Sequence, residues 1–173
     1  MLKTIAIIPA RGGSKGIPKK NLTEICGKPL IAWSILQCLN SELIDQVWVT
    51  SDDDEILQTS IAYGANPIKR PQQISSDNSS SEEAWIHAID FISKRNIVFD
   101  VVLGIQATSP LRNSQDFDNA IKKFRETNAD SLLSVVELED FFVWKKTKDT
   151  IKAINYDYKN KKIKQNIEKK FLK

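Results

Sequence analysis

Four cationic side chains gather in one short loop near the start of the chain. Residues 10–20 read ARGGSKGIPKK and carry Arg11, Lys15, Lys19 and Lys20 with no acidic residue among them. Glycines in such a loop let backbone amides approach phosphate oxygens, and the cations neutralise charge on a polyanion or on leaving pyrophosphate. The loop therefore predicts a triphosphate site. On its own it is also compatible with a solvated tight turn.

Other kinds of active site are poorly supported. The loop matches neither GxxxxGK[ST] nor GxGxxG, so the usual signatures of NTPases and dinucleotide enzymes are missing. His87 is the one histidine and sits in a predicted helix, which leaves no nucleophile–base pair for a hydrolase triad. The acids at 52–54 are typical of a helix start, with a direct metal role as the lesser alternative.

The elements that would position these residues alternate between strand and helix. Short apolar runs predict strands at 4–9, 46–50, 66–68, 101–105 and 131–136, and helical spacing predicts helices at 29–39, 51–63, 82–95 and 114–127. This alternation predicts an α/β fold with a mainly parallel sheet. Ligands of such sheets bind beyond the carboxyl ends of the strands. Besides the loop, those ends carry Ser51, Asp52, Arg70, Gln106, Thr108, Ser109 and Arg112.

The serine-rich loop at 75–81 has two compatible interpretations. Ser80 or Ser81 could cap the helix that follows, with Glu83 as the capping-box partner. The same serines could also contact a ligand.

Composition favours a soluble protein whose cysteines are reduced. The chain has 173 residues, a net charge of +3 and two cysteines, Cys26 and Cys38, without metal-ligand spacing. No apolar run reaches the length of a membrane helix, and no signal peptide is recognisable, so we expect a cytoplasmic protein. Residues 145–173 hold eleven lysines against three acids. Nucleic-acid binding is the alternative that such a tail raises, but no known nucleic-acid motif accompanies it. We therefore expect neither a nucleic-acid nor a membrane partner.

Six motifs occur together across the first part of the chain, and they resemble the acylneuraminate cytidylyltransferase family. They are PARGGSKGIPKKN at 9–21, GKPLIAW at 27–33, TSDDDEI at 50–56, KRP at 69–71, SDNSSS at 76–81 and QATSPLR at 106–112. The resemblance implies a Rossmann-like nucleotidyltransferase domain with a C-terminal dimerisation arm, and hence a homodimer. It also implies transfer of CMP from CTP to the anomeric hydroxyl of a nonulosonic (sialic-acid-like) acid, with Mg²⁺ as cofactor.

The resemblance also implies roles for particular residues. Arg11 and Lys20 would be catalytic, steadying charge in the transition state. The nucleotide would be bound by Ala10, Gly12, Ser14, Lys15, Asn21, Arg70 and Ser81. The sugar would be bound by Gln106, Ser109 and Lys164.

The C-terminal part departs from the family pattern. We expect a nucleotide-binding domain at 1–137 and an incomplete dimerisation and substrate arm at 138–173. The family's Arg-Arg-Gln step reads Ile163-Lys164-Gln165, which replaces a bidentate grip with a point charge. The Asn-Gly step and the acids that hold Mg²⁺ in the family are expected to be missing, so the metal ligands are unassigned. A CTP-binding homologue with impaired catalysis is therefore the alternative function.

Overall fold

The structure is a computed structural model, and it describes residues 2–76, 79–138, 144–148, 150–154 and 170–172. The chain divides into two compact units, Met1–Asn128 and Ala129–Lys173. The boundary predicted between 137 and 138 falls inside the second unit. Among the helices of the described residues, none combines the length and apolar character needed to cross a bilayer.

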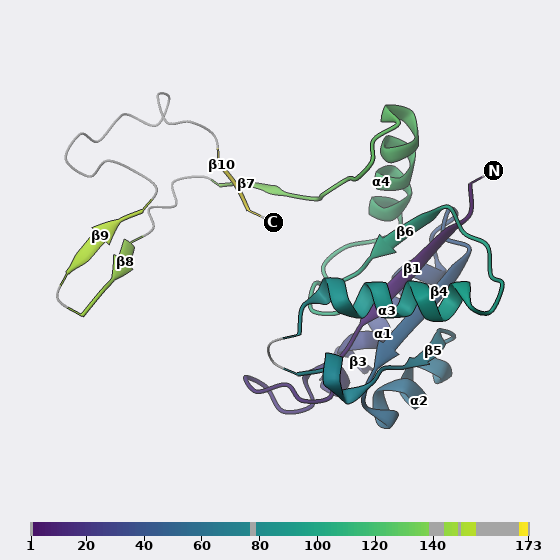
Figure 1. The fold of residues 1–173 in the computed structure, drawn as a ribbon, viewed down its shortest axis with the longest axis horizontal. Helices are drawn as coiled ribbons and strands as arrows, with labels where there is room; N and C mark the ends of the chain where they lie inside the picture. Colours follow the sequence, from purple (N-terminus) through teal and green to yellow (C-terminus); the bar gives the residue numbers. More distant parts are fainter. Residues whose placement is uncertain (1, 77–78, 139–143, 149, 155–169, 173) are drawn as a thin grey trace. The chain divides into compact units, whose positions relative to one another are not determined.

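The first unit is built on a parallel sheet of four strands. These are β1 (Thr4–Pro9), β4 (Gln46–Ser51), β5 (Asn66–Lys69) and β6 (Val101–Gly104), in the order β5-β4-β1-β6 (Figure 1). The central strand β1 pairs with β4 from Ile5↔Gln46 and with β6 from Thr4↔Val101. Its apolar run is buried on both faces, as expected for a strand inside a parallel sheet. The predicted parallel α/β fold is confirmed.

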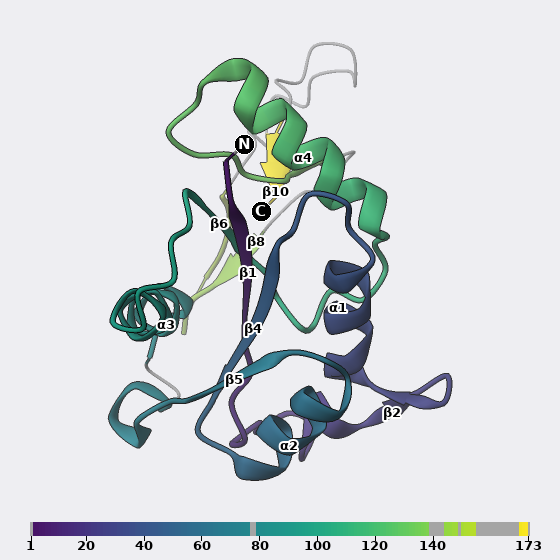
Figure 2. The same cartoon turned by 90° about the vertical axis from the view of Figure 1, so that its right-hand side faces the viewer.

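Helices cover both faces of this sheet. They are α1 (Leu30–Leu39), α2 (Asp54–Ala62), α3 (Ser81–Ser93) and α4 (Ser114–Thr127). Figure 2 shows α3 on one face and α1 on the other. One core cluster joins Ile8 of β1 to Ile35 of α1, whereas the other joins Ile7 to Ile92 of α3. Shorter elements are η1 (Lys20–Leu22), β2 (Glu24–Ile25), β3 (Lys28–Pro29) and η2 (Gln72–Ile74).

Side-chain caps mark where α2, α3 and α4 begin, whereas α1 has none. Asp53 caps α2, and Ser80 caps α3 in the predicted capping box with Glu83. Asn113 forms a second capping box at the start of α4. Gly64 follows the end of α2 with φ +93°, a conformation that favours glycine.

A buried carboxylate fastens α4 to the rest of the domain. Asp118 accepts hydrogen bonds from Ser41 Oγ at 2.5 Å and from the amides of Glu42 and Leu43 at 3.3 and 3.1 Å. Burial alone would raise the pKa of Asp118, but these hydrogen bonds outweigh it, and the pKa lies below its ordinary value of 3.8.

The second unit contains two small antiparallel pairs. β7 (Val136–Leu138) pairs with β10 (Lys170–Leu172), and β8 (Trp144–Lys146) pairs with β9 (Ile151–Ala153).

The strand predicted at 131–136 is wrong for most of its length. Residues 131–135 have no regular structure, and Leu132 and Leu133 are 48% and 55% exposed. An apolar run becomes a strand only where another strand completes its hydrogen bonds. Here that partner is met from Val136 onward, in β10.

Candidate active site

A cavity of about 260 Å³ lies at the carboxyl end of the parallel strands in the first unit. It collects loops that follow β1, β5 and β6 together with the start of α3. This is the edge at which parallel sheets bind their ligands. Seven of the predicted site residues line it: Arg11, Ser14, Lys20, Asn21, Arg70, Ser81 and Gln106.

The cationic loop is held in shape from both of its ends. At its start, the amide of Ala10 donates to Thr50 O at 3.0 Å and so extends the pairing of β1 with β4. At its end, the buried side chain of Asn21 donates from Nδ2 to Arg11 O at 3.1 Å. Asn21 therefore closes the loop on itself, which brings Arg11 and Lys20 to the same cavity.

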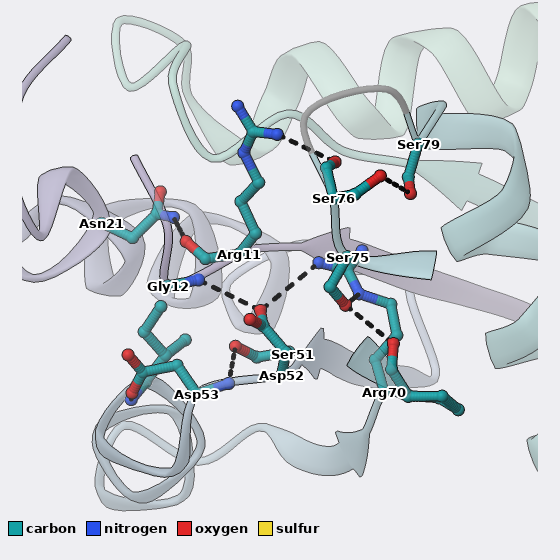
Figure 3. A network of polar contacts seen from close by, with 12 residues as sticks. Arg11, Gly12, Asn21, Ser51, Asp52, Asp53, Arg70, Ser75, Ser76 and Ser79 are labelled. Carbon is teal, nitrogen blue, oxygen red and sulfur yellow. Dashed lines mark hydrogen bonds and ion pairs between the residues drawn. The ribbon is translucent and has the colours of Figure 1, made fainter. Parts of the chain in front are cut away.

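Asp52 connects the cationic loop to Arg70 (Figure 3). Its Oδ1 accepts the amide of Gly12 at 3.1 Å and lies 3.9 Å from the NH2 nitrogen of Arg70. The side chains of Arg70 and Asp52 are only 5% and 18% exposed, so solvent screens this pair weakly. Asp52 thus aligns two sequence-distant parts of the cavity wall.

Arg70 is the most buried cation of the cavity. Its Nε donates to Ser75 Oγ at 2.9 Å, and its backbone amide donates to Ser51 O at 2.8 Å. Burial lowers the pKa of Arg70, Asp52 raises it in part, and the nearby charge of Arg11 lowers it again. Because a guanidinium stays charged in proteins, these two arginines place concentrated positive charge beside the cavity.

The serine-rich loop forms the opposite wall. Arg11 NH1 donates to Ser76 O at 3.0 Å, and the hydroxyls of Ser76 and Ser79 share a hydrogen bond of 3.0 Å (Figure 3). Ser80 caps α3 and also lines the cavity, so the capping prediction is confirmed, while ligand contact by the serines stays a prediction.

Several cavity residues were not assigned a role from the sequence. They are Pro9, Ile74 and Ala107, whereas Ser75, Ser76, Ser79, Ser80 and Thr108 were noted only as members of a loop or strand end. For the serines the signal was present, since a polar loop follows a predicted strand.

Other predicted site residues lie outside the cavity lining. Ala10 is buried in the core beneath it, and the amide of Gly12 is engaged by Asp52. Lys15 and Ser109 are exposed and do not line it. Lys164 lies outside the described residues.

The acids at 52–54 each have a structural contact. Asp52 holds Gly12, Asp53 caps α2, and Asp54 pairs with Lys69 at 2.6 Å. In the described part of the chain, no group of three His, Cys, Asp or Glu side chains could hold a metal ion. The prediction that these acids mark a helix start is confirmed, although it is Asp53 that serves as the cap.

Strand order, parallel register and a cation-lined cavity define an α/β domain of the nucleotidyltransferase type. Solved structures share this fold. One is a CMP:2-keto-3-deoxy-manno-octonic acid synthetase complexed with CTP, 26% identical with a TM-score of 0.63, covering 77% of this chain and 50% of that one. Another is a 4-diphosphocytidyl-2C-methyl-D-erythritol synthase, 17% identical with a TM-score of 0.69, covering 87% and 67%.

The sequence profile described as "Cytidylyltransferase" matches residues 5–170, and the chain belongs to this family. It is 41% identical over 139 residues to the pseudaminic acid cytidylyltransferase of Campylobacter jejuni strain 81-176. This match covers 80% of this chain and 60% of that protein. It is 39% identical to N-acylneuraminate cytidylyltransferase A of Danio rerio, covering 79% and 31%. It is 33% identical to the CMP-N,N'-diacetyllegionaminic acid synthase of Legionella pneumophila, covering 78% and 58%. The chain thus spans at most about three fifths of these relatives.

Proposed function

We propose that this chain binds CTP in the cavity and transfers CMP to the anomeric hydroxyl of a nonulosonic acid, releasing pyrophosphate. The observation that carries the proposal is the cavity lining, which contains Arg11, Lys20 and Arg70 and, among the described residues, no carboxylate. Such a lining suits a triphosphate. The names of the relatives supply the acceptor, and the two Campylobacter jejuni pseudaminic acid cytidylyltransferases favour pseudaminic acid as the first one to test.

The proposed reaction needs position and charge more than covalent help from the protein. The anomeric oxygen forms a bond to the α-phosphorus of CTP, and the bond between that phosphorus and the bridging oxygen to the β-phosphorus breaks. Pyrophosphate leaves with the electron pair, and the hydroxyl proton passes to water. Arg11 and Lys20 would offset the charge that grows on the leaving group. Gln106, in the loop after β6, would face the acceptor.

The described residues do not provide a metal site of their own. The acids nearest the cavity are already used as contacts within the fold, and no metal-binding cluster occurs among the described residues. The expected Mg²⁺ stays a prediction, to be tested by varying the metal in the assay.

Two measurements on the full chain test the proposal. Calorimetry measures CTP binding, and a coupled assay follows pyrophosphate release with Mg²⁺ and pseudaminic, legionaminic or N-acetylneuraminic acid. We expect release only when CTP and one of the acids are present together. Lys20→Ala should weaken CTP binding at least tenfold and lower turnover by about 10²-fold or more. Lys123→Ala, at an exposed position of α4, is the matched control and should change neither.

The outcomes separate the two candidate functions. CTP binding without release with any of the acids would favour the alternative, a CTP-binding homologue with impaired catalysis. Failure to bind CTP would overturn both. The predicted homodimer, the arm at 138–173, the role of Lys164 and the cytoplasmic location remain predictions, and light scattering on the full chain checks the first of them.

A further inference from the structure

Arg112 is a half-buried arginine that lies next to the cavity without lining it. Its NH2 nitrogen donates to Ser34 Oγ of α1 at 3.0 Å and to the carbonyl oxygen of Gln106 at 3.1 Å. Its guanidinium lies 5.2 Å from the centre of the Phe117 ring. Within the described residues Arg112 forms no salt bridge. Its partly desolvated positive charge is therefore compensated by hydrogen bonds and not by an opposite charge.

The loop that carries Arg112 has a second attachment to α1. Gln37, one turn after Ser34 on the same helix, donates from Nε2 to Pro110 O at 2.7 Å. Within the loop, the amide of Ser109 donates to Gln106 O at 3.3 Å. The carbonyl oxygen of Gln106 therefore accepts two hydrogen bonds. The loop between β6 and α4 is attached to α1 through Ser34 and Gln37.

Gln106 is one of three residues of this loop that line the cavity, together with Ala107 and Thr108. Its Nε2 donates to Ser81 Oγ at 3.2 Å, at the start of α3. Its Oε1 accepts no hydrogen bond from the described residues, so the amide oxygen remains available to a ligand hydroxyl. Gln106 is thus held by Arg112 at its backbone and by Ser81 at its side chain, with one acceptor left open.

We propose that Arg112 is the positioning residue that fixes Gln106 for recognition of the acceptor sugar. The identity of the ligand in this inference rests on the proposed function. The contacts that hold Gln106 in place do not depend on it. Arg112 would act through Gln106 and would not touch the sugar. Replacing it should therefore impair acceptor binding while leaving CTP binding unchanged, because the cationic loop and Arg70 are held by other contacts.

Arg125 provides a matched control at the other end of the sheet. Its NH2 nitrogen also bridges a carbonyl and a hydroxyl, Leu2 O at 2.8 Å and Thr4 Oγ1 at 3.1 Å, at the start of β1. The Nε atoms of both arginines are buried and have no hydrogen-bond partner among the described residues. A lysine at either position has a single ammonium group on a flexible stem and cannot reproduce the planar donor geometry. Arg112→Lys and Arg125→Lys therefore make the same chemical change at and away from the cavity.

Two readouts test the proposal. In the pyrophosphate assay, Arg112→Lys should raise KM for the acceptor about tenfold, equivalent to about 1.4 kcal/mol, and leave KM for CTP within about twofold. In ¹⁵N–¹H spectra of the full chain without ligand, it should shift the side-chain amide signals of Gln106, assigned by their loss in Gln106→Glu. Arg125→Lys should leave both readouts unchanged. Ser34→Ala, which removes one partner of Arg112 and keeps the arginine, should shift the same signals by less.

The outcomes distinguish this inference from the proposed function. If Arg112→Lys changes neither the side-chain amide signals of Gln106 nor KM for the acceptor, as expected for Arg125→Lys, the positioning role is overturned. If the wild-type chain releases no pyrophosphate but Arg112→Lys still shifts the Gln106 amide, the proposed function fails and the hold of Arg112 on Gln106 is supported. A silent wild type with an unmoved amide would overturn both.

Discussion

Alanine in place of Gly12 would put a methyl group where the structure has no room for one. A Cβ atom built at Gly12 lies 2.5 Å from Asp53 Oδ2 and 2.8 Å from Asp53 Cβ. Rotating the Asp53 side chain moves its carboxylate but not its Cβ, so the loop itself has to shift. Such a shift stretches the hydrogen bond from Gly12 to Asp52, and rotation removes the Asp53 cap from α2.

The expected magnitude follows from those two contacts. Loss of a helix N-cap costs about 1 kcal/mol, and loss of a hydrogen bond to a charged group costs about as much or more. We therefore expect Gly12→Ala to lower the free energy of unfolding by about 2 kcal/mol. In a protein of this size that corresponds to a melting temperature lower by about 4–8 °C. CTP affinity should fall about tenfold, because Arg11 moves with the loop.

The neighbouring glycine is the control. A Cβ atom at Gly13 meets nothing within 4 Å, and its backbone is outside the positive-φ region. Gly13→Ala should therefore leave the melting temperature unchanged or raise it slightly, since alanine restricts the unfolded chain. Thermal unfolding followed by circular dichroism, with and without CTP, measures both variants. Equal melting temperatures for the two variants would refute the packing argument.

Three further predictions concern caps, pH and thiols. Ser80→Ala and Asn113→Ala should each lower the free energy of unfolding by about 1 kcal/mol in denaturant titrations, but only Ser80→Ala should also change CTP affinity. Burial alone would raise the pKa of Asp118, yet its hydrogen bonds hold it below 3.8, so its contribution to stability is present above that pH and lost as the pH falls. The difference in melting temperature between wild type and Asp118→Asn should thus shrink on acidification, and a constant difference would contradict this reasoning. Burial raises the pKa of the Cys38 thiol to about 12 whereas Cys26 is exposed, so a thiol reagent should modify one cysteine in the native chain and two after unfolding.

Local patterns in the sequence were enough to predict most of the first unit. The apolar run at Thr4–Pro9 and the capping box of Ser80 and Glu83 are determined by neighbouring residues, and both occur as predicted. The cationic loop was placed correctly because the carboxyl ends of parallel strands share one edge. That rule brought Arg11, Lys20 and Gln106 to one cavity.

Long-range hydrogen bonds account for what the sequence could not predict. Asp52 looked like a helix-start acid, but its partner is Gly12, forty residues earlier in the chain. Arg112 was noted at a strand end, yet its contact with Ser34 spans 78 residues. The apolar run at 131–135 failed as a strand because periodicity shows which residues could pair and not whether a partner strand is present.

The position of β1 in the middle of the sheet has a consequence for how the protein folds. This strand is synthesised first, but its register with β6 begins at Thr4↔Val101, and Arg11 meets Ser76 only after 65 intervening steps of chain. Contacts between residues so far apart in the sequence slow folding, because the chain loses the entropy of loop closure before these contacts contribute any stabilisation. On the ribosome, the cationic loop must emerge long before the walls that complete its cavity. A ligand of the complete cavity, such as the proposed CTP, would therefore stabilise only a chain that has been made past Gln106, and it would not assist the first steps of folding.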